Sequence, residues 1–126
     1  MASPTDCLYS ESHEWHKVQG DVVTIGITRY AVDALTDVTF VQPKAVGTKV
    51  SAGGTVGEVE SVKTTSDIYS VVGGEIVEVN KAVVEDPSLL NKDPMSNWLL
   101  KIRMSDKAGL GKLMDSAAYD AKYPAH

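Results

Sequence analysis

Cysteine, basic residues and long apolar runs are all scarce in this chain of 126 residues. The lone cysteine, Cys7, cannot form an internal disulfide, and a metal site built on several cysteines is impossible. No apolar run approaches the ~20 residues that a membrane-spanning helix needs. The first residues lack the basic and apolar regions of a signal peptide and the arginine-rich character of a transit peptide. We therefore expect a soluble chain that is either cytosolic or already processed.

Acidic side chains outnumber basic ones, with 17 Asp and Glu against 12 Lys and Arg and a net charge of −5. A negative protein repels phosphate backbones and anionic lipid, so we expect neither a nucleic-acid nor a membrane partner. The 43% of apolar and 23% of charged residues are typical of a folded globule. The length predicts a single domain over residues 1–126, with flexible ends at residues 1–6 and 124–126.

The motifs of common catalytic sites are absent: the sequence contains no GxSxG, HExxH, P-loop or GxGxxG. The histidines are His13, His16 and His126. Cys7 with His13 or His16 would supply a nucleophile and a base, but no orienting Asn or Asp pattern accompanies them. A packed or exposed thiol without a catalytic role is favoured, and we expect no catalytic residues and no metal.

Short β segments separated by turns dominate the first 80 residues. Apolar residues alternate over residues 18–27 around a Gly-Asp pair, which predicts a hairpin. Thr28 precedes apolar residues at three- and four-residue spacing, which predicts a short helix capped by its hydroxyl. Residues 38–41 predict a strand closed by Pro43. Over residues 44–80, β-branched residues alternate with glycines, as in a small sandwich or flattened barrel.

Segments 57–62 and 74–79 resemble each other, as if they were halves of a β-unit related by pseudo-symmetry. The C-terminal third contains two breaks where aspartate precedes proline, at residues 86–87 and 93–94.

Trp98, Leu100 and Ile102 alternate as one face of a predicted strand, with Leu99 on the other face. Ser105 and Asp106 are a plausible cap for residues at helical spacing up to 114, and residues 116–123 predict a last helix.

The most informative segment is the polar stretch 63–66, on which two β-runs converge. This pattern predicts a hairpin with Lys63 at its tip and the amine in water. A turn lysine usually serves only solubility. Here Glu58 and Glu60 precede it and Asp67 follows it, between similar Gly-Glu strand segments, which favours a special role.

A series of short segments occurs in the order and at the spacing of one known family, from Tyr9 to Tyr119. On these segments the chain resembles the H-proteins of the glycine cleavage system, the lipoyl-carrying members of that system. The segments are residues 12–15, 23–28, 30–31, 40–41, 57–63, 66–67, 74–80, 91–94 and 98–99.

The resemblance implies a mainly β fold with short helices, a hybrid β-sandwich of the lipoyl/biotinyl type (barrel-sandwich hybrid) with a helical C-terminus. It implies that Lys63 carries lipoate through an amide bond. It also implies that Ser12, Glu14 and Asp67 line a cleft that shelters the aminomethyl-lipoyl arm. From the residues alone, Ser12 would be a turn hydroxyl, Glu14 a solvated carboxylate and Asp67 a turn residue. Trp15 is interpreted as a core aromatic, as is Trp98.

The resemblance further implies a carrier rather than an enzyme. Glycine decarboxylase, the P-protein, would load the aminomethyl group, the aminomethyltransferase, or T-protein, would remove it, and dihydrolipoamide dehydrogenase, the L-protein, would reoxidise the arm. A lipoate ligase or a lipoyl or octanoyl transferase would attach the lipoyl group. A monomer is expected, in the cytoplasm if the source is bacterial and in the mitochondrial matrix if it is eukaryotic.

The sequence departs from the family pattern in two places that could change contacts with the partner enzymes. Val71 and Val72 stand where the family has a proline and an aliphatic residue, and the loop at residues 94–97 is short and lacks an aromatic. An H-like lipoyl relay or donor, or a degenerate paralogue, therefore remains an alternative. A biotinyl domain is disfavoured because Val62 and Thr64, not methionines, flank Lys63. In a purely structural interaction module Lys63 would be unmodified.

Overall fold

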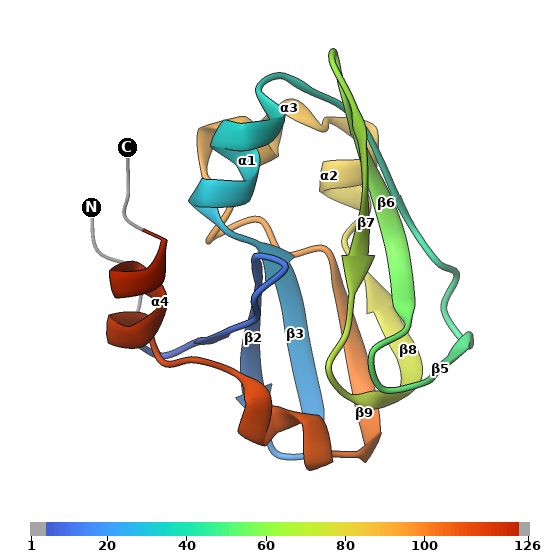
Figure 1. Ribbon diagram of the computed structural model, residues 1–126. Coiled ribbons are helices and arrows are strands. Elements are labelled where there is room, and N and C mark those ends of the chain that lie inside the picture. The colour runs from blue at the N-terminus through green and yellow to red at the C-terminus, as the bar shows by residue number, and fades with distance from the viewer. Residues whose placement is uncertain (1–4, 124–126) are drawn as a thin grey trace.

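The computed structural model describes residues 5–123 and shows two antiparallel sheets with short helices around them (Figure 1). The strand order is β1-β2-β3-β9-β8-β5 in the larger sheet and β4-β6-β7 in the smaller one, and neither closes into a barrel within these residues. The mainly β sandwich prediction is thus confirmed. The strands are β1 (Leu8–Tyr9), β2 (Glu14–Gln19), β3 (Val22–Ile27), β4 (Val38–Pro43), β5 (Lys49–Val50), β6 (Thr55–Ser61), β7 (Thr65–Tyr69), β8 (Gly73–Val79) and β9 (Leu100–Asp106).

The helices are all short, and local sequence signals begin several of them. Thr28 begins α1, because its hydroxyl accepts a hydrogen bond from the Ala31 amide, as predicted. Asn80 caps α2 through the Ala82 amide in the same way. The predicted breaks at residues 86–87 and 93–94 fall at the ends of two helices that the sequence reading did not propose. The helices are α1 (Arg29–Leu35), α2 (Lys81–Glu85), α3 (Ser88–Lys92), a 3₁₀ helix η1 (Ala108–Lys112) and α4 (Ser116–Lys122).

Two hairpins follow the predictions from the sequence. In the β2–β3 hairpin Gly20 has a φ of 63°, a left-handed conformation that favours glycine. The β6–β7 hairpin extends beyond the rest of its sheet at the top of Figure 1, and its tip holds Lys63. The similar segments 57–62 and 74–79 lie on β6 and β8, in different sheets.

Two apolar clusters form the core. The larger one lies between the sheets and includes Ile25, Ile68 and Ile76, all 0–1% exposed. The smaller one is aromatic: Trp15 and Tyr119 are buried in it, and Trp98 packs against it while partly exposed. Trp15 is thus a core aromatic, as predicted. No helix among residues 5–123 is long and apolar enough to cross a membrane.

The C-terminal third departs from its predicted pattern. Leu99, predicted on the face opposite Leu100, lies just before β9 and is fully buried, as Leu100 is, so the two faces do not differ in burial at this point. The predicted cap at Ser105 and Asp106 is wrong: both lie on β9, and the N-cap residue is Lys107, which makes no side-chain cap hydrogen bond, although the Asp106 carboxylate accepts from the Ala108 amide. The segment that follows is the 3₁₀ helix η1 and not an α-helix. The last predicted helix is confirmed as α4, whereas His126 and the ends at 1–4 and 124–126 lie outside the described residues.

Candidate functional site

The tip of the β6–β7 hairpin presents Lys63 to solvent. The Ser61 amide donates to the Thr64 carbonyl at 2.8 Å, and the Ser61 hydroxyl accepts from the Lys63 and Thr64 amides at 3.3 and 3.2 Å. The Val62 amide donates to the Asp37 carbonyl, which ties the tip to the start of the neighbouring strand. The turn backbone is therefore fixed while the exposed Lys63 ammonium has no ion-pair partner among the described residues.

Carboxylates surround the base of this tip. Glu58 on β6 lies directly opposite Asp67 on β7, and both side chains are exposed. Like charges at directly opposed positions of a sheet repel, so this pair does not stabilise the hairpin. Glu60 lies opposite Thr65, one step nearer the tip. Asp67 is a strand residue and not the turn residue that its local sequence suggested.

A cleft of about 210 Å³ lies beside the hairpin, and Ser12, Glu14 and Asp67 all line it. One wall comes from α1 and is apolar, while β7 and the turn before β2 supply polar groups. Thr64, the residue after Lys63, also lines it, so the tip adjoins the cleft. The full lining is Ser12, His13, Glu14, Ile27, Ala31, Ala34, Leu35, Val59, Thr64, Ser66, Asp67 and Ile68.

Glu14 is buried, with 1% of its surface exposed, so it is not a solvated carboxylate. Ser10 and Ser12 donate hydroxyl hydrogen bonds to its Oε1, and the Tyr69 amide donates to its Oε2 at 3.2 Å. Burial raises the pKa of Glu14, and these hydrogen bonds oppose that rise. No lysine or arginine among the described residues pairs with it. The cleft therefore contains a buried carboxyl group with no paired basic side chain among the described residues.

His13 joins the cleft to the C-terminal helix. Its Nδ1 lies 2.8 Å from the Tyr119 hydroxyl, which lies 2.8 Å from the Thr28 hydroxyl. His13 has a φ of 72°, and its carbonyl accepts from the Thr28 amide. Desolvation lowers the pKa of His13, which favours the neutral ring. Tyr119 was not predicted as a partner of the cleft, because a local pattern carries no signal for a contact across 106 residues. Ser10 was not predicted either, although it lies only four residues before Glu14.

Comparison with known proteins matches residues 7–125 to the family model described as glycine cleavage H-protein. The chain belongs to the glycine cleavage H-protein family, the lipoyl carriers of the glycine cleavage system. It is 49% identical to glycine cleavage system H protein 1 of Caldanaerobacter subterraneus subsp. tengcongensis over 90% of this chain and 91% of that protein. It is 48% identical to the H protein of Paraburkholderia phymatum over 94% and 95%.

A solved structure agrees with this assignment. The crystal structure of a glycine cleavage system H protein from Mycobacterium marinum superposes with a TM-score of 0.87 at 41% identity. The match covers 95% of this chain and 98% of that one. The fold and the family are therefore established together.

The two departures from the H-protein pattern have local structural compensations. After β7 the Ser70 hydroxyl donates to the Val72 carbonyl at 2.8 Å and accepts from the Val72 amide at 3.1 Å. Val72 itself is fully buried. In the short loop, the Asp93 carboxylate accepts from the Met95 and Ser96 amides. Side-chain hydrogen bonds thus hold both turns without the family's usual proline or aromatic.

The alternative catalytic pair gains no support from the structure. Burial and the nearby Asp6 carboxylate raise the pKa of Cys7 to about 11, so the thiol stays protonated near neutral pH. His13 has Tyr119 as its partner. His16 is fully buried, with neither ring nitrogen hydrogen-bonded within the described residues. Cys7 is a packed side chain, as the sequence favoured.

Proposed function

We propose that Lys63 is lipoylated and that this H-protein shuttles an aminomethyl group from the P-protein to the T-protein, with reoxidation of the arm by the L-protein. The observation that carries this proposal is the junction of tip and cleft. Lys63 lies exposed on a fixed turn, and Thr64 beside it lines a cleft that contains the unpaired Glu14 carboxylate. A tethered group on Lys63 therefore begins at the edge of a pocket that contains a carboxyl group.

The residues present fit a lipoyl group. The Lys63 side chain supplies the amine for an amide bond, and acylation removes the charge of that amine. When bound, the dithiolane supplies a disulfide that accepts the aminomethyl group and becomes reduced. Ala31, Ala34 and Leu35 offer an apolar wall to the hydrocarbon chain.

In this proposal the polar groups of the cleft hold the cargo amine. Glu14 supplies negative charge, Ser12 and Ser10 fix the orientation of its carboxylate, and Asp67 adds a second carboxylate at the cleft edge. Charge-assisted hydrogen bonds to a cationic amine are stronger than neutral ones. Exclusion of water by the apolar wall slows hydrolysis of the cargo.

The chain acts in this scheme as a substrate of other enzymes. A lipoate ligase or a lipoyl or octanoyl transferase acts on the Lys63 amine, and the P-, T- and L-proteins act on the arm. We propose a monomer, because an arm that visits several enzymes needs an open tip. The relatives named above come from bacteria, which favours a cytoplasmic location over the mitochondrial matrix.

Lipoylation is tested by co-expression with a lipoate ligase and peptide mass spectrometry. We expect one lipoyl group on Lys63, none on Lys63→Arg, and full modification of Lys112→Arg, a matched change at another exposed lysine. An unmodified Lys63, or modification that persists in Lys63→Arg, would contradict the carrier proposal.

Glycine–bicarbonate exchange separates the glycine cleavage role from that of an H-like relay or paralogue. The lipoylated protein is mixed with a P-protein of the same source, and exchange of labelled bicarbonate into glycine is measured. We expect exchange that requires Lys63 lipoylation. Absence of exchange with fully lipoylated protein would favour the relay or the degenerate paralogue.

A further inference from the structure

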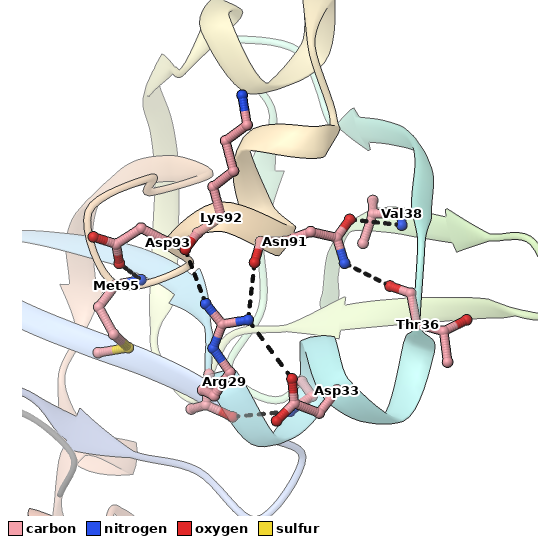
Figure 2. Close-up of polar contacts among 10 residues, drawn as sticks. Arg29, Asp33, Thr36, Val38, Asn91, Lys92, Asp93 and Met95 are labelled. Atoms are coloured by element: carbon pink, nitrogen blue, oxygen red, sulfur yellow. Dashed lines mark hydrogen bonds and ion pairs between the residues drawn. The ribbon is translucent and has the colours of Figure 1, made fainter. Parts of the chain in front are cut away.

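A set of polar contacts joins α1 to α3 (Figure 2). The Asn91 side chain donates through Nδ2 to the Thr36 carbonyl at 2.7 Å and accepts through Oδ1 from the Val38 amide at 2.9 Å. Arg29 donates from Nη1 to the Asn91 carbonyl at 2.9 Å and from Nη2 to the Lys92 carbonyl at 3.1 Å. We call these two side chains and their hydrogen bonds the Asn91 clip. The clip holds both ends of α1 from the last turn of α3.

The wall that α1 gives the cleft needs such support. With seven residues, α1 is too short to be stable as an isolated helix. It ends at Thr36, whose φ of 67° is uncommon for a residue other than glycine. The Thr36 carbonyl is the acceptor for Asn91, so the clip fixes the residue at which the helix is forced to stop.

Apolar packing holds α1 on the sheet. Val32 and Leu35 are buried in the larger core cluster and keep the helix on the sheet. Ala31, which lines the cleft, packs against the same cluster, and Ala34 is a second small residue of this wall. Apolar contacts are non-directional, so the directional hydrogen bonds of the clip add a constraint on how α1 is rotated.

We propose that Asn91 and Arg29 are positioning residues that hold α1 against the cleft and thereby set how long the aminomethyl cargo is retained. Neither residue lines the cleft, so each acts through α1. This inference rests on the proposed sheltering function, and it adds residues to which no role in the carrier has been given above.

The first test uses the full chain without lipoate. Amide hydrogen exchange is measured at Val32 and Thr36 in wild type, Asn91→Ala and Asn97→Ala. Asn97 is a matched control, because its Nδ2 also donates to two carbonyls at the same helix, those of Leu89 and Asp93, without touching α1. We expect exchange in α1 about five- to tenfold faster in Asn91→Ala and unchanged in Asn97→Ala.

The second test measures cargo loss from the loaded protein. Loss breaks the bond between the sulfur and the methylene carbon: the sulfur leaves as a thiolate and is protonated, and water converts the released carbon and nitrogen to formaldehyde and ammonia. Formaldehyde release should be about three- to tenfold faster in Asn91→Ala than in Asn97→Ala. Asn91→Asp, which keeps the acceptor for Val38 and loses the donor to Thr36, should lie between them.

Equal release from Asn91→Ala and Asn97→Ala would overturn the inference, even if their α1 exchange rates differ. Should Asn91→Ala fail to fold, Arg29→Ala takes its place, because it leaves the Thr36 and Val38 bonds intact. Failure of the sheltering function itself is recognised separately. In that case the loaded wild type would release formaldehyde as fast as free aminomethyl-dihydrolipoamide, whichever variant is compared with it.

Discussion

The hairpin tip and the floor of the cleft treat their charged groups in opposite ways. Lys63 is exposed, and the hydrogen bonds of its turn use backbone groups and the Ser61 hydroxyl, leaving the amine free. Glu14 is buried, and both of its carboxylate oxygens accept hydrogen bonds. Attachment of a lipoyl group requires an accessible amine, whereas retention of the cargo requires polar groups that are already held in place. Substitutions should therefore affect modification at the tip, and stability and retention at the floor.

The largest effect on the free energy of unfolding should come from acid acting on β2, the strand that holds both Glu14 and His16. Burial lowers the pKa of His16 from 6.5 to about 4, so the unfolded chain binds a proton there first as the pH falls. Stability from the neutral ring is complete above pH 6.5 and is lost between pH 6.5 and about 4. Between pH 7 and 4.5 the His16 ring should lower the free energy of unfolding by about 2–3 kcal/mol. We expect His16→Leu to abolish this decrease, as measured by urea unfolding at the two pH values.

Glu14 contributes a pH dependence of stability opposite in sign to that of His16, so the two contributions must be separated. Its raised pKa means that the folded state binds the proton more tightly, so Glu14 favours the folded state at low pH and loses that contribution as the pH rises. Glu14→Gln should therefore steepen the acid loss, whereas His16→Leu should flatten it. An unchanged pH slope in His16→Leu would show that its buried ring does not control acid stability.

Truncation of Glu14 should have the next largest effect. Glu14→Ala leaves the Tyr69 amide without its acceptor and removes the carboxylate to which Ser10 and Ser12 donate, and should cost about 1–2 kcal/mol in chemical unfolding. It should also speed cargo loss by about tenfold, with lipoylation unchanged. Glu58→Ala on the exposed hairpin face is the matched control and should change stability by less than about 0.5 kcal/mol. Equal rates of cargo loss from the two variants would show that Glu14 in the cleft retains the cargo no better than Glu58 on the exposed hairpin face.

The smallest effect should come from the turn at the tip. Ser61→Ala removes the acceptor for two turn amides and should cost about 0.5–1 kcal/mol, with lipoylation a few times slower because the tip is less ordered. Thr48→Ala removes a turn hydroxyl bonded to the Ala45 carbonyl elsewhere and should leave the lipoylation rate alone. Initial rates with a lipoate ligase measure both. A slower rate in Thr48→Ala would indicate a general loss of stability instead.

Local signals predicted the parts of the fold that depend on near neighbours. Gly20 in the first hairpin, the Thr28 cap and the tip at Lys63 all rest on contacts within a few residues, and all three are confirmed. The helices α2 and α3 were missed because each has only five residues and too short an apolar pattern to detect. The burial of Leu99 could not be predicted from alternation, because its side chain packs in the core formed by distant strands.

The cleft could not be predicted from local sequence patterns either. Composition and spacing alone favoured a solvated Glu14, and only the family resemblance placed it with Ser12 and Asp67. The groups that bury and orient it include the Tyr69 amide, 55 residues away in the chain. The clip on α1 could not be predicted either, since Asn91 and Thr36 are separated by 55 residues. Contacts between distant residues, which build the pocket, leave no local pattern.

The most direct test of the central claim compares cargo loss from the intact protein with loss from a peptide. Loaded H-protein and a loaded synthetic peptide of residues 58–70 carry the same arm on Lys63, but only the intact chain has the cleft. Formaldehyde release is measured for both at the same pH and temperature. We expect release at least about tenfold slower from the intact protein. Equal rates would show that the cleft does not shelter the cargo.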